Sequence, residues 1–447
     1  MPIGSYGTLL SLPLKEGYGI DFTFASYPKV AIKYWGTPTA AGFIKWDNAT
    51  QITPLSYTSN NAFFFRISDS GASPTQGLLA NENILTLPYY ETAGQTFNPT
   101  VNNYDVTRTT AAYQLANAEV TQSLVFAKDV ILNSNFALAG NPFMSSIDFA
   151  TLQTDHSTLI KSNYRLWDKS SSNYNVYSED GVSISEIPTK TGFVVEQYDG
   201  ADAIGSLVFP LALTATASSV SPAPQLTNNA NKLFFTATNE YGTSPISVIT
   251  KRPYGSDLFG NADAGMLLSE TDIPQVYTLK PNAAGATVGA AINVISANNA
   301  IIPLAIKSDY NGATTLNFSG MDNYQDAIYL LDYTTGAEIN LSQTAEYAYE
   351  FVNAGSSNSR FAIAIRQPVP TTIANNATDN ILVLNLNGTI EIKSIDKIEQ
   401  VQIFTATGAL VYSSANGNTI STSLLPTGIY NIKVRTTKDI AVKKIKL

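Results

Sequence analysis

Alternation of apolar residues with small or polar ones recurs from one end of the chain to the other. Residues 30–34 (VAIKY) and 361–365 (FAIAI) are two examples. Because successive side chains of a β-strand point to opposite faces, this period of two predicts strands rather than helices. Only 147–159 suits a short helix, for which Ser146 or Asp148 could provide the N-terminal cap. The pattern therefore predicts an all-β fold.

Turn chemistry and composition support the same fold class. The segment 333–336 (YTTG) separates AIYLLD from AEINL, which is typical of a β-hairpin with a longer, glycine-containing loop. Charged residues make up only 14% of the chain, whereas Tyr (24) and Phe (20) are abundant. Aromatic residues pack well on the pleated surface of a sheet. The composition therefore favours sheets over helices.

Two segments rich in small residues and proline divide the chain. They are Thr214–Gln225 (TATASSVSPAPQ) and Pro368–Asp379 (PVPTTIANNATD). A length of 447 residues agrees with about three domains at roughly 150 residues each. We therefore expect tandem β-sandwich modules: a β-rich module at 1–213, a jelly-roll-like sandwich at 226–367 and a small immunoglobulin-like sandwich at 380–447.

Charge is distributed unevenly between these regions. From Asn380 onward eight Lys or Arg residues stand against four acids, a balance of +4. Subtracting this from the net charge of −9 leaves −13 for residues 1–379. Phosphate backbones bind basic surfaces, so we expect no nucleic acid partner. The C-terminal region differs electrostatically from everything before it.

Other compositional features bear on compartment and chemistry. Cysteine is absent, so the chain has neither disulfides nor thiol chemistry. No run of about 18 apolar residues predicts a transmembrane helix. Met1–Ser5 lacks the basic start and apolar core of a signal peptide. If the protein is exported, we expect this sequence to be a mature or truncated form of it.

Three ordered motifs near the C-terminus resemble a known family. They are 401–412 (VQIFTATGALVY), 425–434 (LPTGIYNIKV) and 443–447 (KKIKL). They resemble the strand–turn–strand, the LPxGxYxxxV element and the basic last strand of type A sorting domains, which the type IX secretion system of Bacteroidota reads. Thr405 departs from the pattern, because the family often has Asp before this turn. We expect that change to affect turn stability more than recognition.

The resemblance implies secretion or display on the outer cell surface. It also implies two partners, an outer-membrane translocon and a sortase-like peptidase that removes the tail. For the three final lysines, a structural alternative is that they only prevent pairing of an exposed strand edge. The residues that the resemblance assigns to the sorting signal are Gly408, Pro426, Gly428, Tyr430, Lys443, Lys444 and Lys446.

Alternation within the C-terminal region predicts how its strands face. In 429–435 the even positions are apolar and should line a core, whereas the odd positions include charged residues and should remain solvated. The three leucines of 382–386 should face that core. In the last strand the apolar phase slips between Val442 and Ile445, which predicts a β-bulge or a late change of register.

The body of the chain carries a weaker resemblance. Residues 136–143 (FALAGNPF) followed by 147–149 (IDF) resemble a GNPYPSxIDW segment of large surface proteins that carry this tail. The order of motifs in 303–363 is similar to that of the β-domain that usually precedes the sorting domain. These resemblances imply fold and export, and no specific activity.

Residues for catalysis or metal binding are sparse. The single histidine, His156, has Asp and Ser only as chain neighbours, and adjacent residues point apart. Asp pairs occur in Asn- and Gly-rich segments, where Asp usually forms turns. An irregular calcium site in 319–326 stays open as an alternative. We therefore predict no catalytic residue, no cofactor and no metal. The Asp pairs are Asp199 with Asp202, Asp257 with Asp263, and Asp322 with Asp326.

Aromatic residues leave one binding function open. Trp35, Trp46 and Trp167 could stack on sugar rings, although packing in a core is the commoner role of such side chains. The leading hypothesis is a non-catalytic secreted or surface protein of adhesin or matrix type. The alternative is a carbohydrate-binding module that contacts a surface glycan, and a glycan hydrolase is the third hypothesis.

Overall fold

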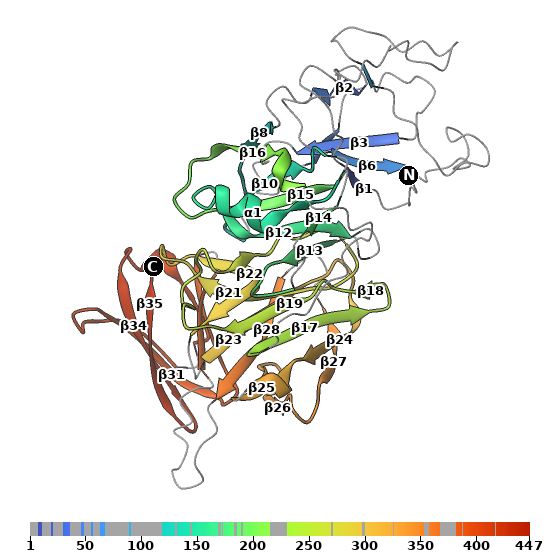
Figure 1. The fold of residues 1–447 in the computed structure, drawn as a ribbon. Helices are drawn as coiled ribbons and strands as arrows, with labels where there is room; N and C mark the ends of the chain where they lie inside the picture. The colour runs from blue at the N-terminus through green and yellow to red at the C-terminus, as the bar shows by residue number, and fades with distance from the viewer. Residues whose placement is uncertain are drawn as a thin grey trace. The chain divides into compact units, whose positions relative to one another are not determined.

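The computed structural model describes most of residues 119–447 and only backbone strands before them. The strands before residue 119 are β1 (Thr8–Leu10), β2 (Gly19–Ile20), β3 (Val30–Trp35), β4 (Trp46–Asn48), β5 (Leu55–Ser56), β6 (Phe63–Ile67) and β7 (Tyr89–Tyr90) (Figure 1). Within 119–447 the residues outside the description are 130–131, 144, 169–170, 172, 183–185, 189–190, 215–229, 270, 297–299, 325, 353–356, 367–380, 387 and 416.

The chain forms two compact units. The first comprises residues 1–131 and 135–225, and the second comprises 132–134 and 226–447. Most of the two predicted linkers, 215–225 and 368–379, lies outside the described residues. The three-domain division of the sequence therefore stays a prediction.

The first unit contains a five-stranded sheet of order β13-β12-β15-β10-β9, in which β13, β12, β15 and β10 are antiparallel to their neighbours among these four. It also contains two separate antiparallel strand pairs, β16-β8 and β11-β14. The elements are β8 (Glu119–Val125), β9 (Ala127–Asp129), β10 (Ser134–Gly140), β11 (Ile147–Asp148), α1 (Phe149–Asp155), β12 (Ile160–Asp168), β13 (Asn173–Tyr177), β14 (Glu186–Ile187), β15 (Gly192–Gln197) and β16 (Ile204–Pro210).

The predicted short helix is present as α1. Asp148 is its N-cap, and the Asp148 side chain accepts a hydrogen bond from the Thr151 backbone N–H at 3.0 Å. Just before it, the Asn141 side chain donates to the carbonyls of Ser145, Ile187 and Pro188. One asparagine thus ties together chain segments that lie 46 residues apart.

The second unit begins with a twelve-stranded sheet whose main path is β26-β25-β28-β23-β21-β22-β19-β17-β24-β27. Its strands are antiparallel except for the parallel pair β19–β22. They are β17 (Lys232–Asn239), β18 (Gly242–Thr243), β19 (Ser247–Lys251), β20 (Ala264–Gly265), β21 (Gln275–Pro281), β22 (Thr287–Ile295), β23 (Ala300–Lys307), β24 (Gly312–Ser319), β25 (Ala327–Asp332), β26 (Ala337–Asn340), β27 (Glu346–Phe351) and β28 (Ser357–Arg366).

This sheet curls so that its two ends share one core. Tyr349 on β27 packs edge-on against Phe361 on β28 with ring centroids 4.8 Å apart, although the two strands are far apart in the sheet order. Phe361, Ile363 and Ile365 line this core, as their alternation predicts. The predicted hairpin at 333–336 joins β25 to β26, where Asp332 pairs with Ala337. We call this region, 230–366, the middle domain.

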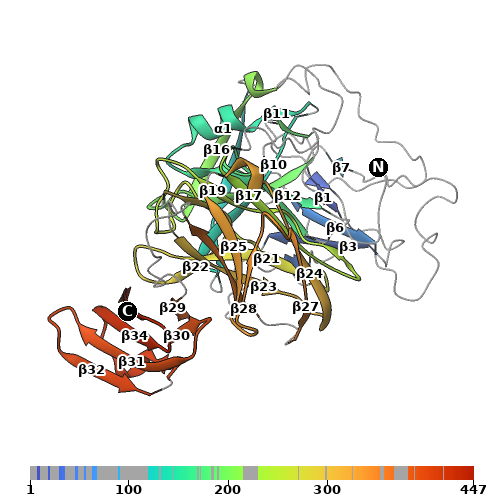
Figure 2. The same cartoon turned by 90° about the horizontal axis from the view of Figure 1, so that it is seen from below.

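Seven strands at the C-terminus form a smaller β-sandwich, residues 381–447, which we call the C-terminal sandwich (Figure 2). One sheet has the order β29-β30-β33 and the other β32-β31-β34-β35, and a single apolar cluster fills the space between them. The strands are β29 (Ile381–Leu386), β30 (Thr389–Ser394), β31 (Ile398–Thr405), β32 (Leu410–Ser414), β33 (Thr419–Ser421), β34 (Ile429–Thr436) and β35 (Ile440–Lys446).

The C-terminal sandwich confirms one predicted row and corrects another. Tyr430, Ile432 and Val434 lie in its core, as predicted. The prediction that the leucines of 382–386 face this core is wrong for Leu382 and Leu384, because Ile381 and Val383 join the core instead. The side chain of Leu386 lies outside the description. Buried Leu382 and Leu384 line a cleft toward the middle domain. Both faces of β29 are covered, and alternation alone cannot tell two apolar faces apart.

The predicted β-bulge or late change of register in the last strand is also wrong. β34 and β35 pair without interruption from Ile429 opposite Lys446 to Arg435 opposite Ile440. The apparent slip arises because Val442 is an apolar residue on the solvent side, where it is 62% exposed. The side chains of β35 therefore still alternate between the two faces, but one of the outward-facing residues is apolar.

Strands dominate the described residues, and the fold class is all-β as predicted. In the described part of the chain no helix has the length and apolarity needed to cross a membrane.

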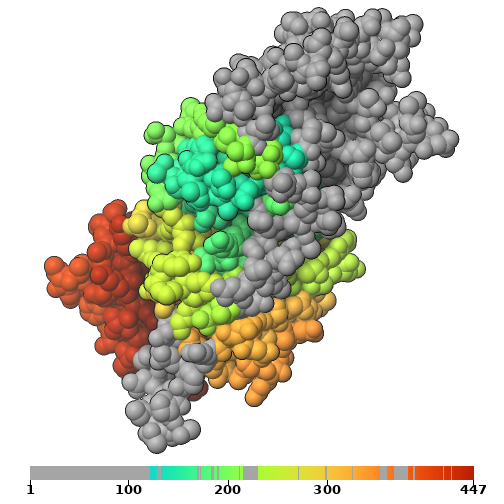
Figure 3. Space-filling model, in the orientation of Figure 1, coloured from blue at the N-terminus to red at the C-terminus, as the bar shows by residue number. Residues whose placement is uncertain are grey.

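The space-filling view in Figure 3 shows atoms of the C-terminal sandwich, in red, on the visible face.

Candidate functional site in the C-terminal sandwich

Gly408 holds the tight turn between β31 and β32. Its φ of 89° lies in the left-handed region, which disfavours any side chain. The Gly408 N–H donates to the Thr405 carbonyl at 3.0 Å, and the Thr405 hydroxyl accepts from the Ala409 N–H at 3.1 Å. The Thr405 hydroxyl thus caps the turn at a position where the resemblance led us to expect Asp.

The LPTGIY segment ties its own end to the last residue of the chain. The Tyr430 hydroxyl donates to the Pro426 carbonyl at 2.7 Å. Gly428 and Leu447 exchange two backbone hydrogen bonds, of 3.1 and 2.9 Å. A Cβ at Gly428 would meet nothing closer than 3.7 Å, so packing alone does not require glycine there.

The three final lysines lie on β35, an edge strand of its sheet. Ala441 lies in the core and Ile445 packs against it, so Lys443 points toward the sandwich and is half-buried. Lys444 and Lys446 lie on the opposite face and are exposed. The predicted trio is therefore split between two faces.

The end of β35 contacts the turn between β21 and β22 of the middle domain. The Lys446 ammonium donates to the Ala283 carbonyl at 2.9 Å, and the Thr287 hydroxyl donates to the Asn385 carbonyl. Gly285 has φ +87°, and a Cβ there would come within 2.8 Å of the Lys446 carbonyl oxygen. Glycine at 285 therefore permits this close approach of two backbones. Sequence reasoning missed the contact, because these partners are about 100 or more residues apart.

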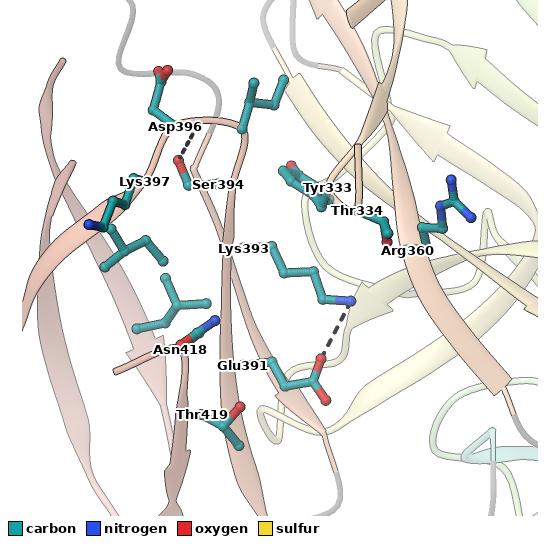
Figure 4. Close-up of a pocket in the computed structure, with 13 residues that line it drawn as sticks. Tyr333, Thr334, Arg360, Glu391, Lys393, Ser394, Asp396, Lys397, Asn418 and Thr419 are labelled. Atoms are coloured by element: carbon teal, nitrogen blue, oxygen red, sulfur yellow. Dashed lines mark hydrogen bonds and ion pairs between the residues drawn. The ribbon is translucent and has the colours of Figure 1, made fainter. Parts of the chain in front are cut away.

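A cleft of about 690 Å³ also lies between the middle domain and the C-terminal sandwich (Figure 4). Arg360 and Tyr333 line it from the middle domain, and Glu391 and Lys393 from β30. The Glu391 carboxylate lies 3.6 Å from the Lys393 ammonium, and burial lowers the pKa of Lys393 while Glu391 opposes that effect. These paired charges make the cleft a hydrophilic seam between the two domains.

Charged residues of the middle domain are engaged in its own structure. The Lys280 ammonium donates to both oxygens of Asp263, at 2.8 and 3.0 Å, and to the Val294 carbonyl. Asp263 also accepts from the backbone of Gly260 and Val294. Burial raises the pKa of Asp263, and Lys280 opposes the rise. Asp263 therefore does more than form a turn, which is all that its sequence context predicted.

Asp332, at the start of the predicted hairpin, is also fully buried. Burial alone would raise its pKa, but hydrogen bonds from Arg360, the Thr334 backbone and Tyr347 prevail and lower it to about 2. Asp332 is thus held ionised inside the fold.

His156 has a local structural role. Its Nδ1 lies 2.8 Å from the Leu152 carbonyl, and its Nε2 accepts a hydrogen bond from the Val208 N–H at 3.0 Å. The first contact requires a proton on Nδ1 and the second a lone pair on Nε2, so the ring is the neutral Nδ1–H tautomer. It links the end of α1 to β16.

The remaining predicted carboxylates are dispersed. Asp199 lies 3.4 Å from the Lys161 ammonium beside a turn at Gly200, and Asp326 is paired with Lys251 at 2.6 Å. Across the described residues, no group of three or more His, Asp or Glu side chains is placed to hold a metal ion.

The three predicted aromatic contacts differ in what is described. Trp167 on β12 is half-buried and packs edge-on against Tyr174, with ring centroids 5.0 Å apart. Trp35 and Trp46 are direct register partners on β3 and β4, and their side chains lie outside the description.

Comparison with known proteins assigns the C-terminal region. Residues 374–447 match the family model described as a secretion system C-terminal sorting domain. No curated protein matches the chain. The matched range includes the whole C-terminal sandwich together with the predicted glycine turn, the LPTGIY segment and the lysine-bearing edge strand. The chain therefore carries at its C-terminus a type IX secretion sorting domain, which indicates secretion or export to the cell surface.

Proposed function

We propose that the protein is a non-catalytic secreted or surface β-protein of adhesin or matrix type, exported through its C-terminal sorting domain. The observation that carries the proposal is the match of residues 374–447, which coincides with a sandwich that has its own apolar core. A sorting domain with a separate core can be read by a transporter while the domains before it stay folded.

The partners in this proposal are an outer-membrane translocon and a sortase-like peptidase of a Bacteroidota cell. In this proposal the C-terminal sandwich is an immunoglobulin-like sorting domain that the secretion machinery recognises. Its recognition elements are the turn at Gly408, the segment from Pro426 to Tyr430, and the lysines of β35. Lys444 suits direct recognition because it is exposed, whereas half-buried Lys443 suits a supporting role.

Gly428 offers a test that separates recognition from folding. Because a Cβ at 428 has room, Gly428→Ala should leave the unfolding transition unchanged. If the secretion machinery reads this backbone, secretion of the variant in a type IX host should fall several-fold. The matched control is Gly260→Ala in the middle domain, where a Cβ likewise has room and meets nothing within 4 Å. Unchanged secretion of Gly428→Ala would remove residue 428 from the recognised set.

The hydrogen bonds of the titratable side chains before the C-terminal sandwich support a structural role for that part of the chain. His156, Asp263 and Asp332 each serve hydrogen bonds within the fold. The test is an array of glycans and extracellular-matrix proteins probed with the full chain, beside an assay for release of sugars or peptides. Binding without product release is expected. Turnover of any arrayed glycan would overturn the non-catalytic proposal.

One observation favours the alternative of carbohydrate binding. Trp35 and Trp46 are opposite each other in the β3–β4 ladder, a relation from which two side chains can form one platform. The variants Trp35→Ala and Trp46→Ala should each weaken glycan binding on the array if this alternative holds. Retained binding in both variants would exclude it.

A further inference from the structure

The outer side of the sheet β32-β31-β34-β35 carries an unusual set of side chains. Tyr430, Ile432 and Val434 point into the core, so Lys433 and Arg435 point away from it. The same reasoning from buried Ala441 places Val442 and Lys444 on this outer side. One side of the sheet therefore carries both cations and aliphatic residues, and its Lys444 end borders the cleft beside the middle domain.

Strand register arranges this face as a checkerboard. Lys433 lies opposite Val442, and Arg435 lies opposite Ile440. Each cation on β34 therefore has an aliphatic cross-strand neighbour, which avoids direct repulsion between like charges. We call the set Lys433, Arg435, Ile440, Val442 and Lys444 the β34–β35 patch.

The two aliphatic side chains of the patch are unusually exposed for residues of a folded domain. Ile440 is 49% and Val442 62% exposed. Of eleven large apolar side chains exposed in the described part of the chain, five lie on strands of this one sheet. Two of these five, Ile440 and Val442, lie in the patch on the edge strand β35, and exposed apolar side chains gathered on one surface mark an interaction site.

Positive charge dominates the patch. Glu399 is the one carboxylate that the structure pairs with any of its described cations, at 3.5 Å from Arg435, and both partners are about half exposed. Exposed pairs of this kind are weak and easily exchanged for another anion. The patch thus combines available cations with aliphatic side chains at the same surface.

We propose that the β34–β35 patch binds the surface of a membrane that contains anionic lipids. Cations of the patch meet the headgroup phosphates, and Ile440 and Val442 enter the boundary between headgroups and acyl chains. Because the patch spreads its cations and aliphatic side chains over two paired strands, it matches an extended surface better than a single protruding ligand.

The charge distribution of the whole chain supports an oriented approach. Residues 1–379 carry −13 and residues 380–447 carry +4. An anionic membrane repels the first part and attracts the second, within a screening length of about 8 Å at physiological salt. The chain therefore meets the membrane through its C-terminal sandwich. This role goes beyond export, and it is measurable on the purified protein without any secretion machinery.

The experiment is flotation of the full chain with vesicles of phosphatidylcholine, with or without phosphatidylglycerol. The face variant is Lys433→Gln/Lys444→Gln. The matched control is Lys397→Gln/Lys438→Gln, which makes the same change in charge at exposed positions of the same sandwich off the patch. We expect binding only to the anionic vesicles, and binding roughly 30-fold weaker for the face variant but nearly unchanged for the control.

Two further arms keep the outcome clear. Val442→Ser should weaken vesicle binding a few-fold without changing net charge, and added salt should weaken binding of the parent chain. Thermal unfolding of each variant checks that loss of binding is not loss of fold. Equal binding to neutral vesicles, or an equal loss in face and control variants, would overturn the proposal. Binding to soluble polyglutamate but not to anionic vesicles would also overturn it and indicate an acidic protein partner.

Discussion

The middle domain and the C-terminal sandwich differ in where they keep their charged groups. In the middle domain Asp263, Lys280 and Asp332 are almost completely buried, and all three have ionic partners. In the described part of the C-terminal sandwich no charged side chain is buried, and Thr436 is the one buried polar residue. Two of its ion pairs, Arg435 with Glu399 and Lys438 with Asp396, have an exposed cation, and a third, Lys393 with Glu391, is partly buried in the cleft beside the middle domain.

This difference separates charges that stabilise the fold from charges that are available to a binding partner. A buried ion pair is committed to the fold, since removing one partner leaves an unpaired charge in a low-dielectric interior. An exposed cation contributes little to stability and remains available to a partner. The same residue types therefore maintain structure in the middle domain and equip the C-terminal sandwich for recognition.

The strongest challenge to this comparison is Asp263→Ala. The substitution leaves the buried Lys280 ammonium without its carboxylate and removes an acceptor from two backbone N–H groups. We expect the free energy of unfolding to fall by about 3–5 kcal/mol, measured by urea denaturation. Adding Lys280→Met should recover part of the loss. A loss below about 1 kcal/mol would show that the pair is not committed to the fold.

Ile432→Ala tests whether the C-terminal sandwich depends on its apolar core alone. Ile432 is fully buried between the two sheets, so its truncation should cost about 2–4 kcal/mol. A small domain has little stability to spare, so limited proteolysis should then cleave within 381–447 first. Cleavage that begins in the middle domain instead would contradict a self-contained C-terminal core.

Acid sensitivity should reside in the middle domain through Asp332. Its pKa of about 2 is below the unfolded value of about 3.9, so its stabilisation is present above about pH 4 and is lost as the pH falls toward 2. We expect a loss of about 1–2 kcal/mol across that window. Urea unfolding of the parent and of Asp332→Asn should therefore differ less at pH 3 than at about pH 7. A gap that does not change with pH would contradict the assignment.

Gly408→Ala measures how much the turn of the C-terminal sandwich relies on its left-handed residue. Since open space surrounds Gly408, the cost is backbone strain alone, about 1 kcal/mol in thermal unfolding. Gly428→Ala is the control without such strain. Equal effects at both glycines would contradict the distinction between turn geometry and recognition.

Glu399→Gln should have the smallest effect. It removes an exposed partner of Arg435, so the free energy of unfolding should change by less than about 0.5 kcal/mol. Binding to anionic vesicles should rise slightly, because the patch becomes more positive. A destabilisation as large as that of Asp263→Ala would erase the contrast between the two regions.

Local sequence patterns predicted local structure well. Alternation identified strands such as β28 and β34, and the cap at Asp148 and the hairpin after Asp332 followed from short motifs. The two errors in the C-terminal sandwich have one cause: in β29 and β35 the apolar residues are not confined to the core side. An alternation with a period of two shows that the two faces of a strand differ, but it does not show which face is covered.

Long-range relations were beyond such patterns. The buried partner residues Asp263, in the bend before β20, and Lys280, on β21, lie 17 residues apart, and the Asn- and Gly-rich context of Asp263 indicated only a turn. Contacts between the β21–β22 turn and the last strand depend on a chain separation of 163 residues. By contrast, the sorting motifs were readable because all of them lie within one small domain.

The most direct test of the central claim is the location of the chain with and without residues 374–447 in a host that has a type IX secretion system. Antibodies against the body would quantify the protein in periplasm, outer membrane and medium. The full chain should reach the surface or the medium, and the shortened chain should accumulate, folded, in the periplasm. Delivery of the shortened chain to the surface in normal amounts would contradict the assignment of export to the C-terminal sandwich.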